Sequence, residues 1–415
     1  MSCGLPGVLG RPRRSVKTSR AVPVLAFGSR AAPRGPGRRR LVASTGPGER
    51  GRRNEGKDAS VTTEEPEVLT SRAGRLGLLT LNRPRALNAL NHPMVRVLTA
   101  TLRAWAADPD VATVAIAGAG ERGLCAGGDI RAIHADATSG TADAGAASAA
   151  FWRDEYRLNA LIARFPKPYV ALMDGIVMGG GVGLSAHGTL RVVTERSRVA
   201  MPETGIGFAP DVGGTWLLAR APGELGTHLA LTGGEMTAGD AVHCGFADHF
   251  AEAHALPALL ADLAHTPAAE AVAAHAGPVP PGELAAARPW IDACYAADTV
   301  EEILARLAAR PEPAAQRAAA TLATRSPTSL KVTLAAVRRA RRLGGLEEAL
   351  EGEYRTSRAL LASPDLAEGV RAQVVDKDRN PRWRPATLAE VGAADVARYL
   401  AGPEHGEGLG LTDSQ

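Results

Sequence analysis

The stretch "KPYVALMDGIVMGGGVGLSAHG" (Lys167–Gly188) predicts the fold of the chain. It begins as an apolar run typical of a buried strand, passes through three consecutive glycines and continues as a helical pattern. A second apolar run, "VATVAIAGAG" (Val111–Gly120), also ends in glycines, and the segment 90–108 before it has the spacing of an amphipathic helix. Strands that alternate with helices are typical of an α/β fold with crossover connections.

Composition divides the chain into three parts. Residues 1–60 are predicted to be a disordered basic extension, residues 61–265 an α/β core, and residues 266–415 a helical carboxyl-terminal region. Strand signals become rare after about residue 250, which is the reason for the last boundary. Residues 135–150 have low complexity and lack large apolar side chains, so we expect a mobile loop or a weak helix there.

Charge is distributed unevenly along the chain. The net charge is +11 over residues 1–60 and −7 over the remainder, although the whole chain is +4. The basic character therefore belongs to the extension, and we expect no nucleic-acid partner for the body. No apolar run approaches the roughly 20 residues that a membrane span needs, so we expect no membrane partner either.

Residues 1–60 leave the compartment open between two alternatives. The segment is rich in Arg, Pro, Gly and Ser and has no acid before Glu49, and it lacks the apolar region of a secretory signal. Such a composition suits a disordered leader in a bacterium with a GC-rich genome, which predicts a cytoplasmic protein. The alternative is an organellar transit peptide, which predicts a mitochondrial location, although the frequent Pro and Gly oppose the amphipathic helix it requires.

The cysteines indicate neither a disulfide scaffold nor a metal site. They are dispersed and form no CxxC pair, and no HExxH spacing is present, so we expect no metal site and a reducing compartment. The four cysteines are Cys3, Cys125, Cys244 and Cys294.

Two glycine-rich turns could supply backbone N–H groups to a ligand. "CAGGDI" (Cys125–Ile130) and "MGGGVGLS" (Met178–Ser185) each lie between a predicted strand and a helix, where N–H groups favour developing negative charge. One N–H from each turn could form an oxyanion hole, whereas tight helix–strand packing would select the same glycines. "GAGERG" (Gly118–Gly123) is a poor dinucleotide fingerprint because further glycines follow it in place of a helix.

The usual nucleophiles have little support in the sequence. No GxSxG elbow is present, and Ser185 and His187 are two residues apart, so they would not face each other on a helix. We interpret His187 as a structural histidine and Cys125 as a small buried hydrophobic residue.

Carboxylates are the remaining candidates for the chemistry. Glu203 and Asp211 lie in the apolar, glycine-rich stretch "MPETGIGFAPDVGG" (Met201–Gly214), and Glu155 lies in a predicted helix. A carboxylate in apolar surroundings has a raised pKa, which suits acid–base or nucleophilic work. A salt bridge is the alternative for each residue, and Asp211 could instead cap a helix that begins at "PDVGG".

Together, these motifs resemble the crotonase (enoyl-CoA hydratase/isomerase) superfamily over about residues 66–395. The resemblance implies a spiral of ββα units with a helical carboxyl-terminal region, and an acyl-CoA substrate, with coenzyme A as part of the substrate and no separate cofactor. It places the oxyanion hole at the N–H groups of Gly128 and Gly180. It also places substrate contacts at Glu155, Gly180, Glu203 and Asp211, with Glu203 and Asp211 as the catalytic pair. The segments that carry it are "LNRPRALNAL", "CAGGDI", "MGGGVGLS", "MPETGIGFAPDVGG", "SPTSLKVTL" and "SPDLAEGVRAQVVDKDRNPRWRP".

One departure from the hydratases of this superfamily indicates the reaction type. Their first catalytic glutamate lies three residues after the oxyanion glycine, and this chain has Gly183 there. In this the chain resembles the hydrolases of the superfamily that cleave short branched 3-hydroxyacyl-CoA thioesters, as in valine breakdown. The predicted function is therefore thioester hydrolysis, with an enoyl-CoA hydratase or isomerase and a non-catalytic acyl-CoA binder as alternatives. A homo-oligomer is possible.

Overall fold

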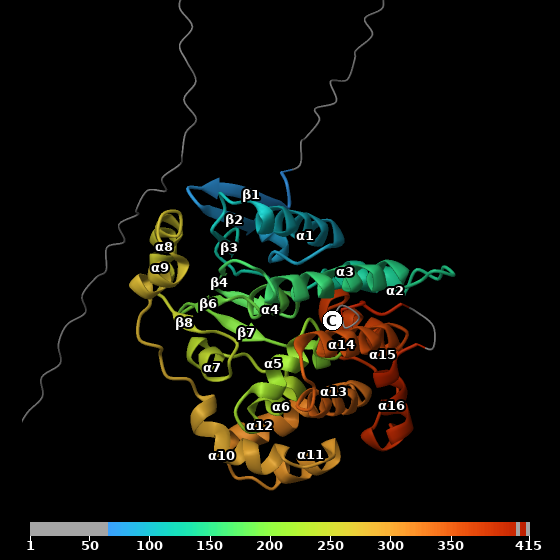
Figure 1. The fold of residues 1–415 in the computed structure, drawn as a ribbon. Coiled ribbons are helices and arrows are strands. Elements are labelled where there is room, and N and C mark those ends of the chain that lie inside the picture. Colours follow the sequence, from blue (N-terminus) through green and yellow to red (C-terminus); the bar gives the residue numbers. More distant parts are fainter. Residues whose placement is uncertain (1–64, 404–406, 412–415) are drawn as a thin grey trace, which may run out of the picture. The chain divides into compact units, whose positions relative to one another are not determined.

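The strands form one mixed sheet and one small sheet. The structure is a computed structural model that describes residues 65–403 and 407–411. The larger sheet has the order β1-β2-β3-β4-β6-β8, in which only the β1–β2 pair is antiparallel (Figure 1). The smaller sheet pairs β5 with β7 in parallel. The strands are β1 (Val68–Ala73), β2 (Leu76–Leu81), β3 (Thr113–Gly118), β4 (Tyr169–Met173), β5 (Ile176–Met178), β6 (Leu190–Val193), β7 (Arg198–Ala200) and β8 (His249–Phe250).

The chain repeats a unit of two strands and a helix. In β4–β5–α4 and in β6–β7–α5, the first strand joins the larger sheet and the second joins the smaller one. This arrangement and the many carboxyl-terminal helices confirm the predicted α/β fold. The helices of the first part are α1 (His92–Ala107), α2 (Ile130–Ala137), α3 (Ala146–Ala163), α4 (Gly180–Ser185), α5 (Gly214–Arg220), α6 (Leu225–Thr232), α7 (Ala238–His243) and α8 (Leu256–Asp262).

The carboxyl-terminal helices pack against the same core as the strands. Leu330 and Leu350, both almost fully buried, belong to one apolar cluster with Ile116 of β3 and Val177 of β5. None of the described helices is both long and apolar enough to cross a membrane. The later helices are α9 (Ala268–His275), α10 (Leu284–Tyr295), α11 (Val300–Ala308), α12 (Pro313–Leu322), α13 (Pro327–Ala340), α14 (Leu346–Leu361), α15 (Pro364–Val370), the π-helical turn η4 (Arg371–Val375) and α16 (Ala393–Ala401).

Local sequence signals explain where several helices begin. Asn91 caps α1 by accepting a hydrogen bond from the Met94 N–H at 3.0 Å, and a proline occupies the first turn. Ser326 caps α13 in the same way, with its Oγ 3.0 Å from the Ser329 nitrogen. These caps lie next to the helices in the sequence and mark where the two helices begin.

The structure differs from the sequence prediction in two places. The run 167–178 is two strands, because Gly175 turns the chain at a φ of +63° between β4 and β5. The low-complexity segment 135–150 is helical at both ends, because α2 ends at Ala137 and α3 begins at Ala146, while residues 138–145 between them are not helical. Alanine has the highest helix propensity, and this outweighs the lack of large apolar side chains.

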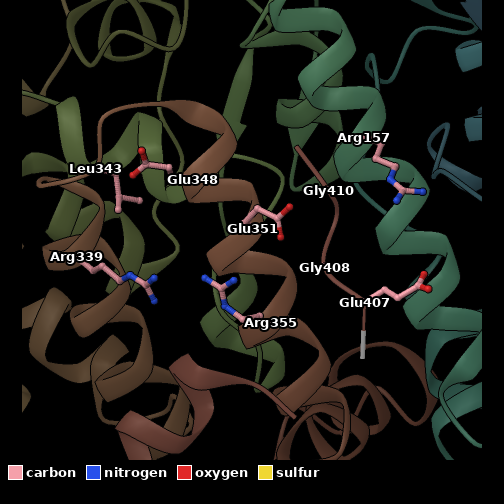
Figure 2. Close-up of a pocket in the computed structure, with 9 residues that line it drawn as sticks. All are labelled: Arg157, Arg339, Leu343, Glu348, Glu351, Arg355, Glu407, Gly408 and Gly410. Carbon is pink, nitrogen blue, oxygen red and sulfur yellow. The ribbon is translucent and has the colours of Figure 1, made fainter. Parts of the chain in front are cut away.

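The last described segment, residues 407–411, binds between α3 and α14 (Figure 2). Glu351 of α14 accepts hydrogen bonds from the Leu409 and Leu411 N–H groups, both at 3.0 Å. Arg157 of α3 donates to the Leu409 carbonyl at 3.0 Å, and the Leu409 side chain is buried. An open cavity of about 660 Å³ lies beside this segment and is lined by three arginines, three glutamates and three apolar residues.

Replacing Glu351 with alanine should destabilise the protein. Two backbone N–H groups would lose their acceptor, at a cost of about 1–3 kcal/mol in the free energy of unfolding. Urea unfolding followed by circular dichroism measures the change, and Glu348→Ala, which removes an exposed glutamate from the same helix, is the control. Equal stability of the two variants would contradict this role of Glu351.

Candidate active site

The five predicted site residues line one cavity of about 150 Å³: Gly128, Glu155, Gly180, Glu203 and Asp211. They come from five separate segments, and the folding of the chain brings them together. The cavity is otherwise apolar and glycine-rich. Its remaining lining is Ala126, Gly127, Ile130, Ile133, Trp152, Gly179, Pro202, Ile206, Phe208 and Leu366.

Two free backbone N–H groups lie side by side in this cavity. Within the described residues, neither the Gly128 N–H nor the Gly180 N–H donates to a protein acceptor. Gly180 is the first residue of α4, where the helical pattern offers the N–H no partner. A Cβ added to Gly180 would lie 3.4 Å from the Gly128 nitrogen, which shows how closely the two groups approach. This pair can bind an oxygen that develops negative charge.

Carboxylates approach these N–H groups from two sides. A Cβ on Gly180 would lie 2.6 Å from Glu155 Oε1, and a Cβ on Gly179 would lie 3.1 Å from Glu203 Oε1. Within the described residues, Glu155 Oε1 and Glu203 Oε2 are buried without a hydrogen-bond partner. Buried polar atoms are normally paired, so these two oxygens indicate a place for a ligand or water.

The electrostatics of the cavity favour protonated carboxyl groups. Glu155, Glu203 and Asp211 are 2%, 6% and 6% exposed, and none of them forms an ion pair in the described part of the chain. Burial, with the charge of Asp211, raises the pKa of Glu155 and of Glu203 well above the usual value. Burial also raises the pKa of Asp211 to about 7. A substrate can therefore meet these groups as acids or as poorly solvated bases.

Replacing Glu155 with glutamine should stabilise the protein at high pH. Because the folded-state pKa is raised, the folded protein binds a proton that the unfolded chain releases, so stability falls as pH rises above about 4.5. Glutamine removes that loss. Thermal unfolding at pH 4.5 and pH 8 tests this: we expect similar melting temperatures at pH 4.5 and a higher one for the variant at pH 8. Glu235→Gln, at an exposed position, should show no such difference.

The loop that carries Asp211 is held by residues from two other segments. Val212 and Gly213 both have left-handed backbones, with φ of 54° and 79°, which is strained for a β-branched residue. His187 donates from Nε2 to the Val212 carbonyl at 2.8 Å. Glu353 of α14 accepts from the Gly213 and Thr215 N–H groups at 2.6 and 2.9 Å, and burial raises the pKa of Glu353 to about 8. The loop conformation is thus fixed by the surrounding structure.

Asp211 does not cap the helix that follows it. The helix α5 begins at Gly214, its N-cap is Gly213, and no side chain of this segment caps it. Glu353 instead accepts the N–H groups at the start of α5. The side chain of Asp211 lines the cavity and does not cap α5, so the capping alternative is wrong.

Position 183 has no room for a side chain. A Cβ on Gly183 would lie 2.7 Å from Val212 Cβ and 2.8 Å from Asn159 Nδ2. A glutamate at this position would require both neighbours to move. The structure thus explains why the chain has glycine at this position.

The three residues that were rejected as a nucleophile or base from the sequence, Ser185, His187 and Cys125, have structural roles. Ser185 Oγ donates to the Gly181 carbonyl at 2.7 Å within α4. Burial lowers the pKa of His187 to about 4 and raises that of Cys125 to about 12, so the histidine is neutral and the thiol protonated. The neutral His187 and the buried, protonated Cys125 agree with the interpretation of these two residues as structural.

Several residues around the site were not predicted from the sequence. Trp152 and Phe208 stack with ring centroids 5.1 Å apart and form an apolar wall of the cavity. The sequence contained a signal for both residues. Aromatic residues make up only 4% of the chain, and Trp152 and Phe208 each lie within a few residues of a candidate carboxylate. Tyr156, Ser357 and Glu353 had no local signal, since the last two come from α14 and meet the site only through tertiary packing.

Comparison with known proteins places the chain among acyl-CoA enzymes. The family described as enoyl-CoA hydratase/isomerase matches residues 76–400. A mitochondrial 3-hydroxyisobutyryl-CoA hydrolase of Danio rerio is 44% identical over 350 residues, covering 81% of this chain and 89% of the relative. The enzyme of the same name from Homo sapiens is 40% identical, covering 82% and 89%.

Solved structures of similar proteins carry different functional names. A carnitinyl-CoA dehydratase from Mycobacterium thermoresistibile has a TM-score of 0.79 and 54% identity, covering 82% of this chain and 98% of that one. An enoyl-CoA hydratase from Rhodobacter sphaeroides has a TM-score of 0.77 and 44% identity, covering 81% and 98%. The shared fold and the extent of the family match lead to one conclusion: this chain belongs to the enoyl-CoA hydratase/isomerase family.

Proposed function

We propose that this protein hydrolyses acyl-CoA thioesters, with 3-hydroxyisobutyryl-CoA as its substrate, as in valine breakdown. The observation that carries the proposal is the pair of Gly128 and Gly180 N–H groups beside carboxyl oxygens of Glu155 and Glu203, none of which has a hydrogen-bond partner among the described residues. The hydrolase relatives support this choice of substrate. The cavity of about 150 Å³ suits a short acyl group.

The reaction would use the N–H pair to stabilise an oxyanion. When an oxygen nucleophile adds to the thioester carbonyl, negative charge builds on the carbonyl oxygen, and the Gly128 and Gly180 N–H groups donate to it. Each donor of this kind is worth about 3–4 kcal/mol in the transition state. Collapse of the intermediate breaks the C–S bond and releases the CoA thiolate, which takes up a proton.

Glu203 can supply the nucleophile in two ways. As a general base it would take a proton from water, the resulting hydroxide would add to the carbonyl, and the carboxyl proton would pass to the leaving thiolate. As a nucleophile it would form a mixed anhydride that water then hydrolyses. Both routes need an ionised Glu203, whose poor solvation makes it reactive.

Asp211 and Glu155 are proposed to bind the 3-hydroxyl group of the substrate. Their carboxylates face a cavity that is otherwise apolar, so a substrate hydroxyl would find its acceptors there. A hydrogen bond to a charged group contributes about 1.5–3 kcal/mol, which is roughly 10- to 100-fold in kcat/KM.

Comparing 3-hydroxyisobutyryl-CoA with isobutyryl-CoA tests this function. The analogue lacks only the hydroxyl group, and we expect its kcat/KM for thiol release to be about 10- to 100-fold lower. In the Asp211→Asn variant, the ratio of the kcat/KM values for the two substrates should be smaller than in the wild type. Equal kcat/KM for both acyl groups would refute the assignment of the hydroxyl site.

A second candidate reaction is the loss or addition of water at an acyl-CoA double bond. The names of the two similar solved structures favour it, and Glu155 and Glu203 form a pair of carboxyl groups near the N–H pair. The glycine at position 183, whose surroundings leave no space for a carboxylate, is the observation against it.

For the compartment we propose the cytoplasm, with mitochondrial import as the alternative that the names of the hydrolase relatives favour. The segment on which the choice depends, residues 1–60, lies outside the described residues. A shortened product after incubation with energised mitochondria would support import.

A homo-oligomer and the lack of a separate cofactor or metal stay predictions from the sequence.

A further inference from the structure

A buried tyrosine connects Asp211 to the carboxyl-terminal region. Tyr156 Oη of α3 donates a hydrogen bond to Asp211 Oδ2 at 2.7 Å and lies 2.8 Å from Ser357 Oγ of α14. A tyrosine hydroxyl has one proton, so when Asp211 receives it, Ser357 donates to the tyrosine oxygen. The result is a chain of two hydrogen bonds, from Ser357 through Tyr156 to Asp211.

The tyrosine has little freedom to move. Its side chain is fully buried, and its ring meets that of Tyr354 edge to face, with centroids 6.1 Å apart. On the outer side of the same two helices, Arg157 and Glu351 both bind the segment 407–411 (Figure 2). Hydrogen bonds to the segment 407–411 therefore hold Arg157, the neighbour of Tyr156 on α3, and Glu351 on α14.

Tyr156 is the side chain that stabilises Asp211 as an anion. The titratable groups that face Asp211 from the surrounding elements are Glu155 and Tyr156 on α3, Glu203 at the start of the 3-10 helix η2 (Glu203–Ile206), and Glu353 on α14. Three of these four are acids and repel a second negative charge. Among the described residues, Tyr156 is the only side chain that donates a hydrogen bond to Asp211.

We propose that Tyr156, oriented by Ser357, is a positioning residue for the thioester hydrolysis, because its hydroxyl directs the Asp211 carboxylate toward the hydroxyl group of the substrate. The proposal rests on the proposed function. The tyrosine holds one carboxylate oxygen, Oδ2, and the proposal assigns the substrate hydroxyl to the other. Without the tyrosine hydroxyl, Asp211 would lose both its orientation and its one side-chain donor.

The same hydrogen bond affects the pH dependence. Burial raises the pKa of Asp211 to about 7, and the hydrogen bond from Tyr156 opposes that rise. Removing the hydroxyl therefore raises the pKa of Asp211 further. If substrate binding needs the carboxylate, the acid limb of kcat/KM moves to higher pH.

The variant Tyr156→Phe tests the proposal, because it removes the hydroxyl and keeps the ring. We expect kcat/KM at pH 7 to fall about 10- to 100-fold, the size expected for a lost hydrogen bond to a charged group. The acid limb of the pH profile of kcat/KM should move to higher pH. The variant Ser357→Ala should move this limb in the same direction, but by a smaller amount. Tyr354→Phe is the matched control, because among the described residues the Tyr354 hydroxyl bonds only to the Ala149 carbonyl, at 3.3 Å. The pH profile of this variant should match that of the wild type.

Two results would overturn the proposal. One is a pH profile of Tyr156→Phe that superimposes on that of Tyr354→Phe. The other is an equal loss at every pH, which would show a merely structural role. The melting temperature measured as a function of pH tests the hydrogen bond without relying on enzyme activity. As pH rises from 5 to 8, the stability of Tyr156→Phe should fall more than that of Tyr354→Phe. A wild-type protein that releases no thiol would refute the proposed function, and the thermal comparison would still decide whether the hydrogen bond holds Asp211 ionised.

Discussion

Replacing Glu203 with glutamine should lower kcat for thioester hydrolysis by about 10³-fold, within the range that a general base contributes. The amide has nearly the same shape, but it can neither take a proton from water nor attack the carbonyl. KM should change little, because the Gly128 and Gly180 N–H groups, which we propose hold the thioester oxygen, remain. Stopped-flow or steady-state detection of free thiol measures this effect.

The loss should not come from misfolding. Glu203 Oε2 has no hydrogen-bond partner among the described residues, so an amide nitrogen in its place breaks no hydrogen bond of the protein. Burial raises the pKa of Glu203, so the variant should be at least as stable as the wild type at pH 8. The exposed-site variant Glu235→Gln should keep full activity. A Glu203→Gln variant with wild-type kcat would remove Glu203 from the mechanism.

Replacing Gly180 with alanine should abolish most of the activity by filling the oxyanion site. The added Cβ would lie 2.6 Å from Glu155 Oε1 and 3.4 Å from the Gly128 nitrogen, in the space that we propose for the thioester oxygen. We expect kcat/KM to fall by about 10²- to 10³-fold, comparable to the loss of one oxyanion donor. Steady-state kinetics with 3-hydroxyisobutyryl-CoA measure the change.

Alanine at Gly128 is the informative comparison for this variant. Its Cβ would meet the Phe151 ring at 3.4 and 3.6 Å, a contact that a small shift of the ring relieves. The Gly128 N–H would remain in place, so the loss should be clearly smaller than for Gly180→Ala. Equal losses for the two variants would mean that the space between these glycines is not where the oxygen binds.

The sequence was sufficient for the local parts of the fold and the site. The apolar runs ending in glycine predicted β3 and β4, and the turns that carry Gly128 and Gly180 follow such runs. Glu203 and Asp211 stood out because few charged residues lie in their apolar, glycine-rich stretch. These features depend on neighbours in the sequence, and the structure preserves them.

The sequence could not predict the contacts made across the chain. Glu353 fixes the loop of Asp211 from a helix 140 residues away, and Ser357 reaches Tyr156 over 201 residues. Both lie on one face of α14, and an amphipathic pattern alone does not show that this face meets an active site. The exclusion of a side chain at Gly183 likewise depends on Val212 and Asn159, which only the fold brings close.

The most direct test of the central claim is a product analysis of 3-hydroxyisobutyryl-CoA after incubation with the full-length protein, followed by mass spectrometry. Thioester hydrolysis predicts free CoA and 3-hydroxyisobutyrate in equal amounts, and the Glu203→Gln variant should form neither at a comparable rate. The contradicting result is an intact thioester that has lost water to give the unsaturated acyl-CoA, because that product would make the protein a dehydratase.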